Sequence, residues 1–133
     1  MTDNSLRETS PERILRVALD LFSRKGYDAA SVREICAAAS ITKPTLYHFY
    51  GSKEGVYRAI VEGALDRFRA DMTRALEGGG TLRDQLSRTA RAYLDGALRQ
   101  PDLSRFVMGL IHDPKHSAPT TDFVGFYQGV VAE

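Results

Sequence analysis

The apolar positions along this chain repeat at helical spacing almost throughout. Residues 12–25 carry an apolar row at i, i+4, i+7 and i+8, which predicts a first amphipathic helix: Ile14, Leu15, Ala18, Leu21 and Phe22. Ser31 followed by Glu34 is the pattern of a capping box and predicts a second, short helix. Thr42 is a candidate N-cap for a third helix, where Pro44 is tolerated because it falls in the first turn.

Three further segments continue the helical pattern. In the first, apolar residues recur at every fourth position up to the glycine run 78–80: Val56, Ile60, Ala64, Phe68, Met72 and Leu76. Thr81 begins another helix, which Pro101 closes and whose apolar row is Leu82, Leu86, Ala90, Tyr93, Leu94 and Ala97. A short apolar helix is expected over 103–111, and apolar residues return over 122–133. Because the alternation typical of strands is missing, the chain is predicted to be all-α.

The connection between the second and third predicted helices is very short. It consists of Ala39, Ser40 and Ile41, so the two helices must cross steeply, as in a helix-turn-helix unit. On a helical wheel, Leu46 and Tyr50 face the first two helices. The opposite side is short and polar or flat, which suits close approach to base edges in a DNA groove: Pro44, Thr45 and His48.

Positive charge adds to this prediction through its position and not through its amount. The chain has 18 Lys and Arg against 17 Asp and Glu, which excludes a polycation that coats nucleic acid. Lys43 lies beside a helix N-terminus, where it adds positive potential for a phosphate. Lys53 lies in the first turn of the fourth predicted helix, where a cation opposes the helix dipole and a phosphate would reverse that penalty.

Composition also bears on the cellular location of the protein. The single cysteine, Cys36, forms no internal disulfide and is expected to be a small buried hydrophobe beside Ile35. The polar N-terminal segment has no apolar leader, so we expect a reducing, cytoplasmic location. The longest uncharged stretch, 123–132, is too short to span a bilayer, and no membrane association is expected.

One run of residues resembles a known family. From Arg13 to about Ile60, and above all in SVREICAAASITKPTLYHFYGSKEGVYRAI, the chain is similar to the DNA-binding head of the TetR family of bacterial transcriptional repressors. The resemblance implies an all-α protein with a three-helix helix-turn-helix head and a helical ligand-binding body. We therefore expect a disordered arm over 1–11, the DNA-binding domain over 12–58 and an incomplete regulatory domain over 59–133.

The resemblance implies DNA contacts for a set of residues along the head: Ser31, Arg33, Lys43, Pro44, Thr45, Tyr47, His48 and Lys53. Within this set, Ser31, Tyr47 and Lys53 match phosphate contacts, and Arg33 matches a position that reaches a base in some members.

Three positions depart from the family pattern. Ser40 stands where glycine is common, which has a modest energetic cost if the turn needs a left-handed backbone. Phe49 and Tyr50 replace a common His-Phe pair, so one histidine contact is absent. Gly55 replaces the Glu that would complete a capping box with Ser52, so the start of that helix is expected to be looser.

The resemblance also implies a homodimer that reads a palindromic operator in double-stranded DNA and is released by a small-molecule effector. Candidate effector-binding residues are Phe68, Met72, Tyr93, Phe106, Met108 and Phe123, which are otherwise core residues. Typical members continue into two more long helices that form the dimer interface. Because 133 residues cannot supply both, we expect a truncated copy.

Two other classes compete with a transcriptional regulator. A small helical ligand- or partner-binding protein without specific DNA binding would show the same apolar pattern. An enzyme is disfavoured because no Ser/His/Asp set or Gly-rich phosphate loop is recognisable. The run 112–116 holds two histidines, but Pro114 breaks the helix that would align them. No metal and no cofactor are expected.

Overall fold

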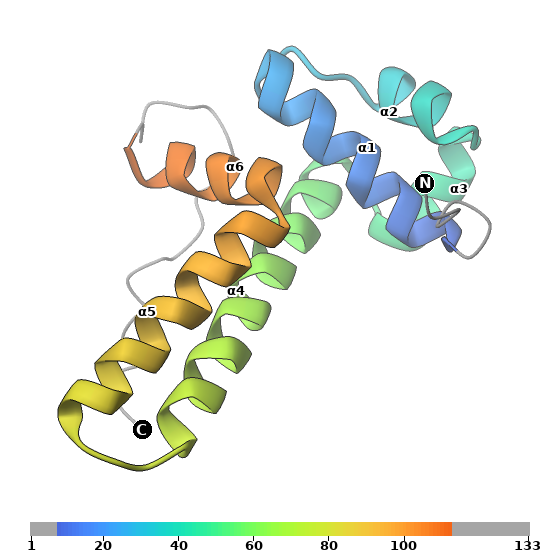
Figure 1. The fold of residues 1–133 in the computed structure, drawn as a ribbon. Helices are drawn as coiled ribbons and strands as arrows, with labels where there is room; N and C mark the ends of the chain where they lie inside the picture. Colours follow the sequence, from blue (N-terminus) through green and yellow to red (C-terminus); the bar gives the residue numbers. More distant parts are fainter. Residues whose placement is uncertain (1–7, 113–133) are drawn as a thin grey trace.

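The structure, a computed structural model, describes residues 8–112, and all regular structure in that range is helical (Figure 1). The helices are α1 (Ser10–Lys25), α2 (Val32–Ala39), α3 (Lys43–Tyr50), α4 (Lys53–Glu77), α5 (Leu82–Arg99) and α6 (Pro101–His112). The prediction of an all-α chain is confirmed for this range. Phe123, the apolar stretch 122–133 and most of the run 112–116 lie outside the described residues.

The first three helices and the N-terminal part of α4 enclose one apolar core. Its largest fully buried side chains are Ile14, Ile35, Leu46, Val56 and Val61. The predicted inward side of α3 is confirmed, since Leu46 is fully buried and Tyr50 packs against the core. Cys36 is buried as well, and burial raises the pKa of its thiol, as befits a small buried hydrophobe.

Local capping explains where most helices begin. The Ser31 hydroxyl accepts from the Glu34 N–H at the start of α2, and the Thr42 hydroxyl accepts from the Thr45 N–H at the start of α3. Further N-caps stand before α4 and α5, as the sequence indicated. Helix α1 begins two residues earlier than predicted because Thr9 and Glu12 form a capping box that the sequence analysis missed.

Helices α1, α2 and α3 with the start of α4 form the head. Helices α4 and α5 form an antiparallel hairpin that extends away from it, and α6 returns to pack against α1 (Figure 1). The predicted boundary between residues 58 and 59 falls within α4, which runs without interruption from the head into the hairpin.

The single apolar row predicted for α4 is wrong at its end. Val56 and Met72 are buried, but Leu76 is 53% exposed and its neighbour Ala75 is buried instead. A helix has 3.6 residues per turn, so each step of four residues rotates the row by about 40°. The row therefore winds around α4, and the buried face has moved to other positions by the last turns.

Helix α5 contributes no buried residue to the part of the chain that the structure describes. Most of its predicted apolar row is exposed, including Leu82, Leu86 and Leu94. At the end of α5, Pro101 has a second role that the sequence analysis did not assign, because it is also the first residue of α6. Proline suits that position because the first helical N–H has no intrahelical partner.

Candidate DNA-binding surface

The turn between α2 and α3 has a left-handed residue at its centre. Ser40 has φ 54° and ψ 48°, which confirms that the turn needs the backbone conformation that glycine would adopt without strain. The Ile41 N–H donates to the Cys36 carbonyl at 3.0 Å, and the Ser40 N–H donates to the Ala37 carbonyl at 3.3 Å. These two bonds close the end of α2 in the manner of a Schellman motif and fix the direction in which α3 leaves.

Long-range hydrogen bonds hold α2 and α3 on the rest of the head. The Arg13 Nε donates to the Ala39 carbonyl at 2.8 Å, which ties α1 to the end of α2. The Tyr50 hydroxyl donates to the Pro11 carbonyl at 3.0 Å, which ties the end of α3 to the start of α1. The end of α2 and the end of α3 are thus each held by a hydrogen bond to α1.

The outer side of α3 presents short, flat and basic side chains. Lys43, Pro44, Tyr47 and His48 are exposed, as predicted, whereas Thr45 is half-buried with its hydroxyl oxygen 2.9 Å from that of Thr42. Tyr47 is 46% exposed, so its phenol is presented to solvent and does not fill the core. The sequence from residue 35 to residue 53 contains no Asp or Glu, so no carboxylate of that segment opposes a phosphate here.

Phe49 belongs to the same surface and was missed by the sequence analysis. Its side chain is 42% exposed, and its ring lies edge-on to that of His48, with the ring centroids 5.2 Å apart. The one sequence signal for this exposure is the helical wheel, which gives Phe49 no buried position. Residue type alone is misleading here, because phenylalanine is ordinarily assigned to the core.

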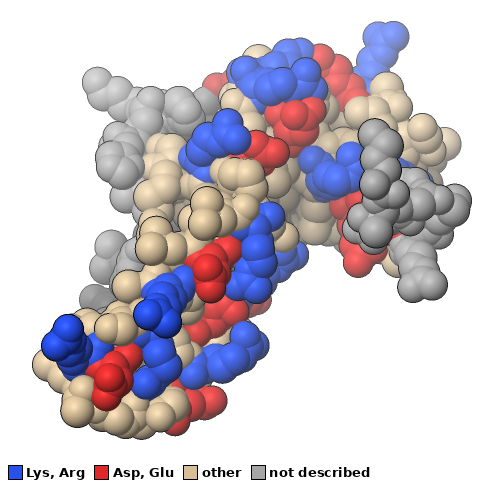
Figure 2. Space-filling view, in the orientation of Figure 1, with Lys and Arg blue, Asp and Glu red and all other residues tan. Residues whose placement is uncertain are grey.

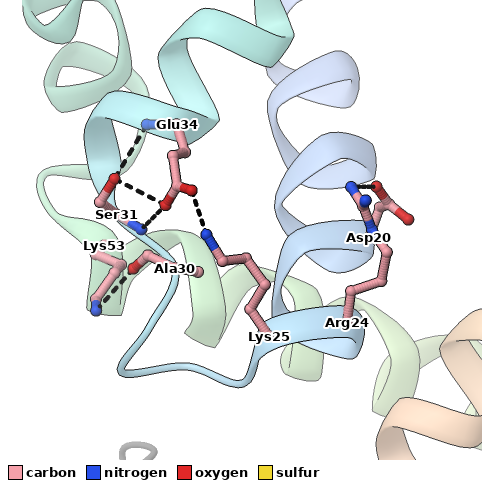
Figure 3. Close-up of polar contacts among 7 residues, drawn as sticks. All are labelled: Asp20, Arg24, Lys25, Ala30, Ser31, Glu34 and Lys53. Atoms are coloured by element: carbon pink, nitrogen blue, oxygen red, sulfur yellow. Dashed lines mark hydrogen bonds and ion pairs between the residues drawn. The ribbon is translucent and has the colours of Figure 1, made fainter.

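Ser31 is occupied by its own capping box. Its hydroxyl lies 3.0 Å from a Glu34 carboxylate oxygen, and its N–H donates to the same oxygen at 3.0 Å (Figure 3). Lys25, at the end of α1, pairs with the other oxygen of Glu34. The Lys25 ammonium and the two Ser31 donors lower the pKa of Glu34 to about 2. A phosphate contact from the Ser31 hydroxyl therefore requires that hydroxyl to leave Glu34.

Lys53 has structural partners that the helix-dipole argument did not foresee. Its Nζ donates to the backbone carbonyl of Ala30 at 3.1 Å (Figure 3). It also donates to the backbone carbonyl of Tyr27 at 2.9 Å, and both residues lie in the connection between α1 and α2. The ammonium also lies 4.3 Å from the centroid of the Tyr27 ring, a cation–π arrangement. An ammonium has three donors, and the two carbonyls take two of them.

Charge on the α4–α5 hairpin has a different distribution. Figure 2 shows Lys and Arg interleaved with Asp and Glu along it, so neither sign gathers there. Several of these charges are paired along the helix, as in Arg58 with Glu54 and Arg74 with Asp71. This pattern is typical of a solvated face and contrasts with the acid-free segment around α3.

The helical body contains a half-open hollow of about 560 Å³ between α4, α5 and α6. Four of the six predicted effector residues line it: Phe68, Met72, Tyr93 and Met108. Phe106 does not line it. Its ring instead packs edge-on against Tyr57 of the head, with the ring centroids 5.7 Å apart, because it lies on the side of α6 that faces α1. Phe123 lies outside the described residues.

Over residues 8–112, no helix is long and apolar enough to cross a bilayer. In the same range, His, Cys, Asp and Glu do not gather in threes where a metal ion could be held.

Comparison with protein families matches residues 14–60 to the bacterial regulatory proteins of the tetR family. The transcriptional regulator UidR of Escherichia coli K12 is 43% identical over 75 residues, which are 52% of this chain and 38% of UidR. The biofilm operon negative regulator IcaR of Staphylococcus epidermidis is 39% identical over 57 residues, covering 43% of this chain and 31% of IcaR. The chain thus spans well under half the length of these relatives.

Solved structures resemble the chain over almost all its length. A tetR family transcription regulator from Shewanella sp. PV-4 superposes with a TM-score of 0.77 at 22% identity, covering 94% of this chain and 65% of that one. The regulator PfmR from Thermus thermophilus gives a TM-score of 0.71 at 25% identity, covering 94% and 63%. The likeness in fold extends beyond the head into the helical body.

Proposed function

Because the chain belongs to the tetR family of bacterial regulatory proteins, we propose that it binds double-stranded DNA through α2 and α3 and regulates transcription. The observation that carries this proposal is the outer side of α3, which is exposed and belongs to a stretch without Asp or Glu from residue 35 to residue 53. Hydrogen bonds to α1 also hold the end of α2, through Ala39, and the end of α3, through Tyr50. An α-helix of that kind fits the major groove of B-DNA.

The proposed contacts divide into two kinds. Lys43, Tyr47 and the remaining donor of Lys53 contact phosphates and set the register on the duplex. The side chains that read base edges lie on the groove side: Arg33, Pro44, Thr45 and His48. Phe49 adds an apolar contact to a thymine methyl group. The Ser31 hydroxyl contacts a phosphate only after it gives up its hydrogen bond to the Glu34 carboxylate.

We propose that the protein acts as a homodimer, in which two α3 helices enter successive major grooves roughly 34–36 Å apart and read a palindrome. The setting is the cytoplasm, where the bacterial chromosome is accessible, and the role requires no catalysis by this chain.

Helix α6 supports a proposal for effector-linked repression. One side of α6 lines the hollow through Val107 and Met108, and another side packs on the head through Phe106 and Tyr57. A ligand that fills the hollow in only one arrangement of α6 thereby favours one placement of the head. Release of DNA then follows as a shift between two populations, because the ligand binds them unequally.

Selection of bound duplexes from a random DNA library tests the proposed function. Recovery of a palindrome supports both the reading head and the dimer. The competing interpretation, a helical ligand- or partner-binding protein without specific DNA binding, predicts that no duplex is enriched and that no DNA is retarded at low salt. The Lys43 and Lys53 variants described in the Discussion then identify the contacts.

A further inference from the structure

The hollow between α4, α5 and α6 combines an apolar lining with an excess of positive charge. Phe68, Met72 and Tyr93 supply aromatic and thioether surface, and the rings of Phe68 and Tyr93 meet edge-on at 6.4 Å. Three arginines also line the hollow: Arg67, Arg74 and Arg99. Asp71 is the one carboxylate among the lining residues that the structure describes. Such a site favours an apolar ligand with an anionic group over a wholly apolar one.

Two of these arginines direct their hydrogen bonds to neutral oxygens. Arg67 Nη1 donates to the side-chain oxygen of Gln100 at 2.8 Å. Arg99 Nε donates to the backbone carbonyl of Asp95 at 3.2 Å. A guanidinium binds a carboxylate or a phosphate about twice as strongly as it binds a neutral oxygen, so an anion arriving here gains more than it displaces.

The nearby carboxylates already have donors. Asp71, inside the hollow, pairs with Arg74 at 3.3 Å. A second hollow adjoins the first on the side of α1, and its acidic residues are also bonded: Glu8 to Arg16, Glu12 to Thr9 and Asp102 to Arg105. These acids are therefore poor competitors for Arg67 and Arg99.

The two arginines stand between the two hollows. Arg67, Arg99, Gln100 and Leu103 line both of them, and the second hollow is bounded by Leu15 and other residues of α1. These four residues form the partition between the hollows, at the end of the body nearest α1. An anion bound there competes with Gln100 for Arg67, and the bond between these two residues links α4 to the connection between α5 and α6.

We propose that the hollow takes an apolar molecule bearing one anionic group, whose charge is held by Arg67 and Arg99 at the end nearest α1. This inference rests on the proposed function for its regulatory meaning, since the ligand is the effector of that proposal. The volume of about 560 Å³ matches a ligand of small-molecule size. Carboxylate and phosphate share the required chemistry, and the experiment separates them.

The test is calorimetric titration of the full chain with probes that differ only in charge: decanoate, decyl phosphate and the neutral decanamide, with 1-naphthoate and 1-naphthamide as a second, rigid pair. We expect an anion to bind about tenfold more tightly than its neutral counterpart at low salt, and less so at high salt. The double variant Arg67→Gln with Arg99→Gln removes this preference by lowering the affinity for the anion towards that for its amide. Arg91→Gln is the matched control on α5, the helix that carries Arg99; it keeps the preference, because Arg91 is exposed and does not line the hollow.

Three results overturn the inference: equal affinity for anion and amide, an unchanged preference in the double variant, or no binding of either pair. Preference for decanoate over decyl phosphate identifies a carboxylate ligand, and the reverse identifies a phosphate ligand; both support the site. DNA binding is measured separately without probe. A chain that prefers the anion but binds no DNA disproves the proposed function alone, and one that binds DNA without preferring the anion disproves this inference alone.

Discussion

The carbonyl oxygen of Tyr50 lies only 1.8 Å from the point that a Cβ at Gly55 would occupy. Tyr50 is the last residue of α3 and Gly55 lies in the first turn of α4, so the close approach sets how sharply the chain turns between them. In the sequence, Gly55 is the residue that leaves the capping box with Ser52 incomplete. The structure shows a steric reason for glycine there, and the one-sided cap remains, with the Gly55 N–H donating to the Ser52 hydroxyl at 2.9 Å.

Replacing Gly55 with alanine is expected to destabilise the head. The new methyl group must displace backbone, so we expect the free energy of unfolding to fall by about 1–3 kcal/mol. Gly63→Ala is the matched control in the same helix, because nothing lies within 4 Å of its Cβ position, and there alanine should add up to about 1 kcal/mol. Urea unfolding followed by circular dichroism measures both, and equal effects would disprove the steric account.

The left-handed Ser40 predicts a stabilising substitution. Ser40→Gly removes the strain of a side chain at φ 54°, and we expect a gain of about 0.5–1 kcal/mol in the free energy of unfolding. Ala38→Gly, within the preceding helix α2, should lower the free energy of unfolding by about 1 kcal/mol, because glycine gives the unfolded backbone more freedom to lose. Thermal unfolding of the two variants beside the parent provides the comparison. A loss of stability in Ser40→Gly would contradict the prediction.

The lowered pKa of Glu34 predicts a dependence of stability on pH. Its carboxyl group titrates near 4.5 when unfolded and at about 2 when folded, because Lys25 and Ser31 favour the charged form. The stabilising contribution is therefore fully present above pH 4.5 and is lost as the pH falls from 4.5 towards 2. Denaturant unfolding of the parent and of Glu34→Gln should differ most at neutral pH, and the difference should shrink in that window.

Lys25→Met is the companion variant for this prediction. It removes the cation that contributes most to the lowered pKa, so the pH dependence attributable to Glu34 should narrow while the Ser31 bonds persist. A difference between parent and Glu34→Gln that stays constant down to pH 2 would show that the pair does not link α1 to α2 in solution.

Two lysines of the proposed DNA surface are expected to behave differently when changed to glutamine. Lys43 is exposed at the start of α3, so Lys43→Gln should lower DNA affinity with a change in stability within about 0.5 kcal/mol. Lys53 bonds to the carbonyls of Tyr27 and Ala30, so Lys53→Gln should also lower the free energy of unfolding by about 1–2 kcal/mol.

The salt dependence of DNA binding separates contact from positioning in these variants. Each lost phosphate contact should reduce the slope of log affinity against log salt by about 0.9. Titrations with one duplex at several salt concentrations give that slope. A parental slope in Lys53→Gln would assign this residue to holding the connection between α1 and α2 and not to the phosphate, and a parental slope in Lys43→Gln would remove that residue from the surface.

Much of the head followed from local sequence because its determinants are local. The caps at Ser31 and Thr42 act on N–H groups three residues away, and the inward side of α3 follows from the helical period. The DNA contacts stay predictions: the helical wheel and the helix N-termini indicate Pro44, Thr45, His48, Lys43 and Lys53, and the resemblance adds Ser31, Arg33 and Tyr47. The exposure of Phe49 has only a weak signal in the sequence, because the packing of α3 on its neighbours decides whether this apolar side chain is covered.

In the body, the sequence predicted helices but not the directions of their side chains. The apolar row of α4 winds around the helix, and Phe106 faces the head while Val107 and Met108 face the hollow. Composition alone does not distinguish these neighbours, because all are apolar and only the packing partner decides which side of α6 is covered.

The sequence by itself determined the helices, their caps, the tight connection before α3 and the absence of acidic residues around it, because each depends on residues close together in the chain. Only the tertiary structure decided that Lys53 binds carbonyls 23 and 26 residues away, that Tyr50 forbids a side chain at Gly55, and that Arg67 and Arg99 meet at one partition. Those relations arise from contacts between helices, whose geometry is fixed by the packing of the whole core.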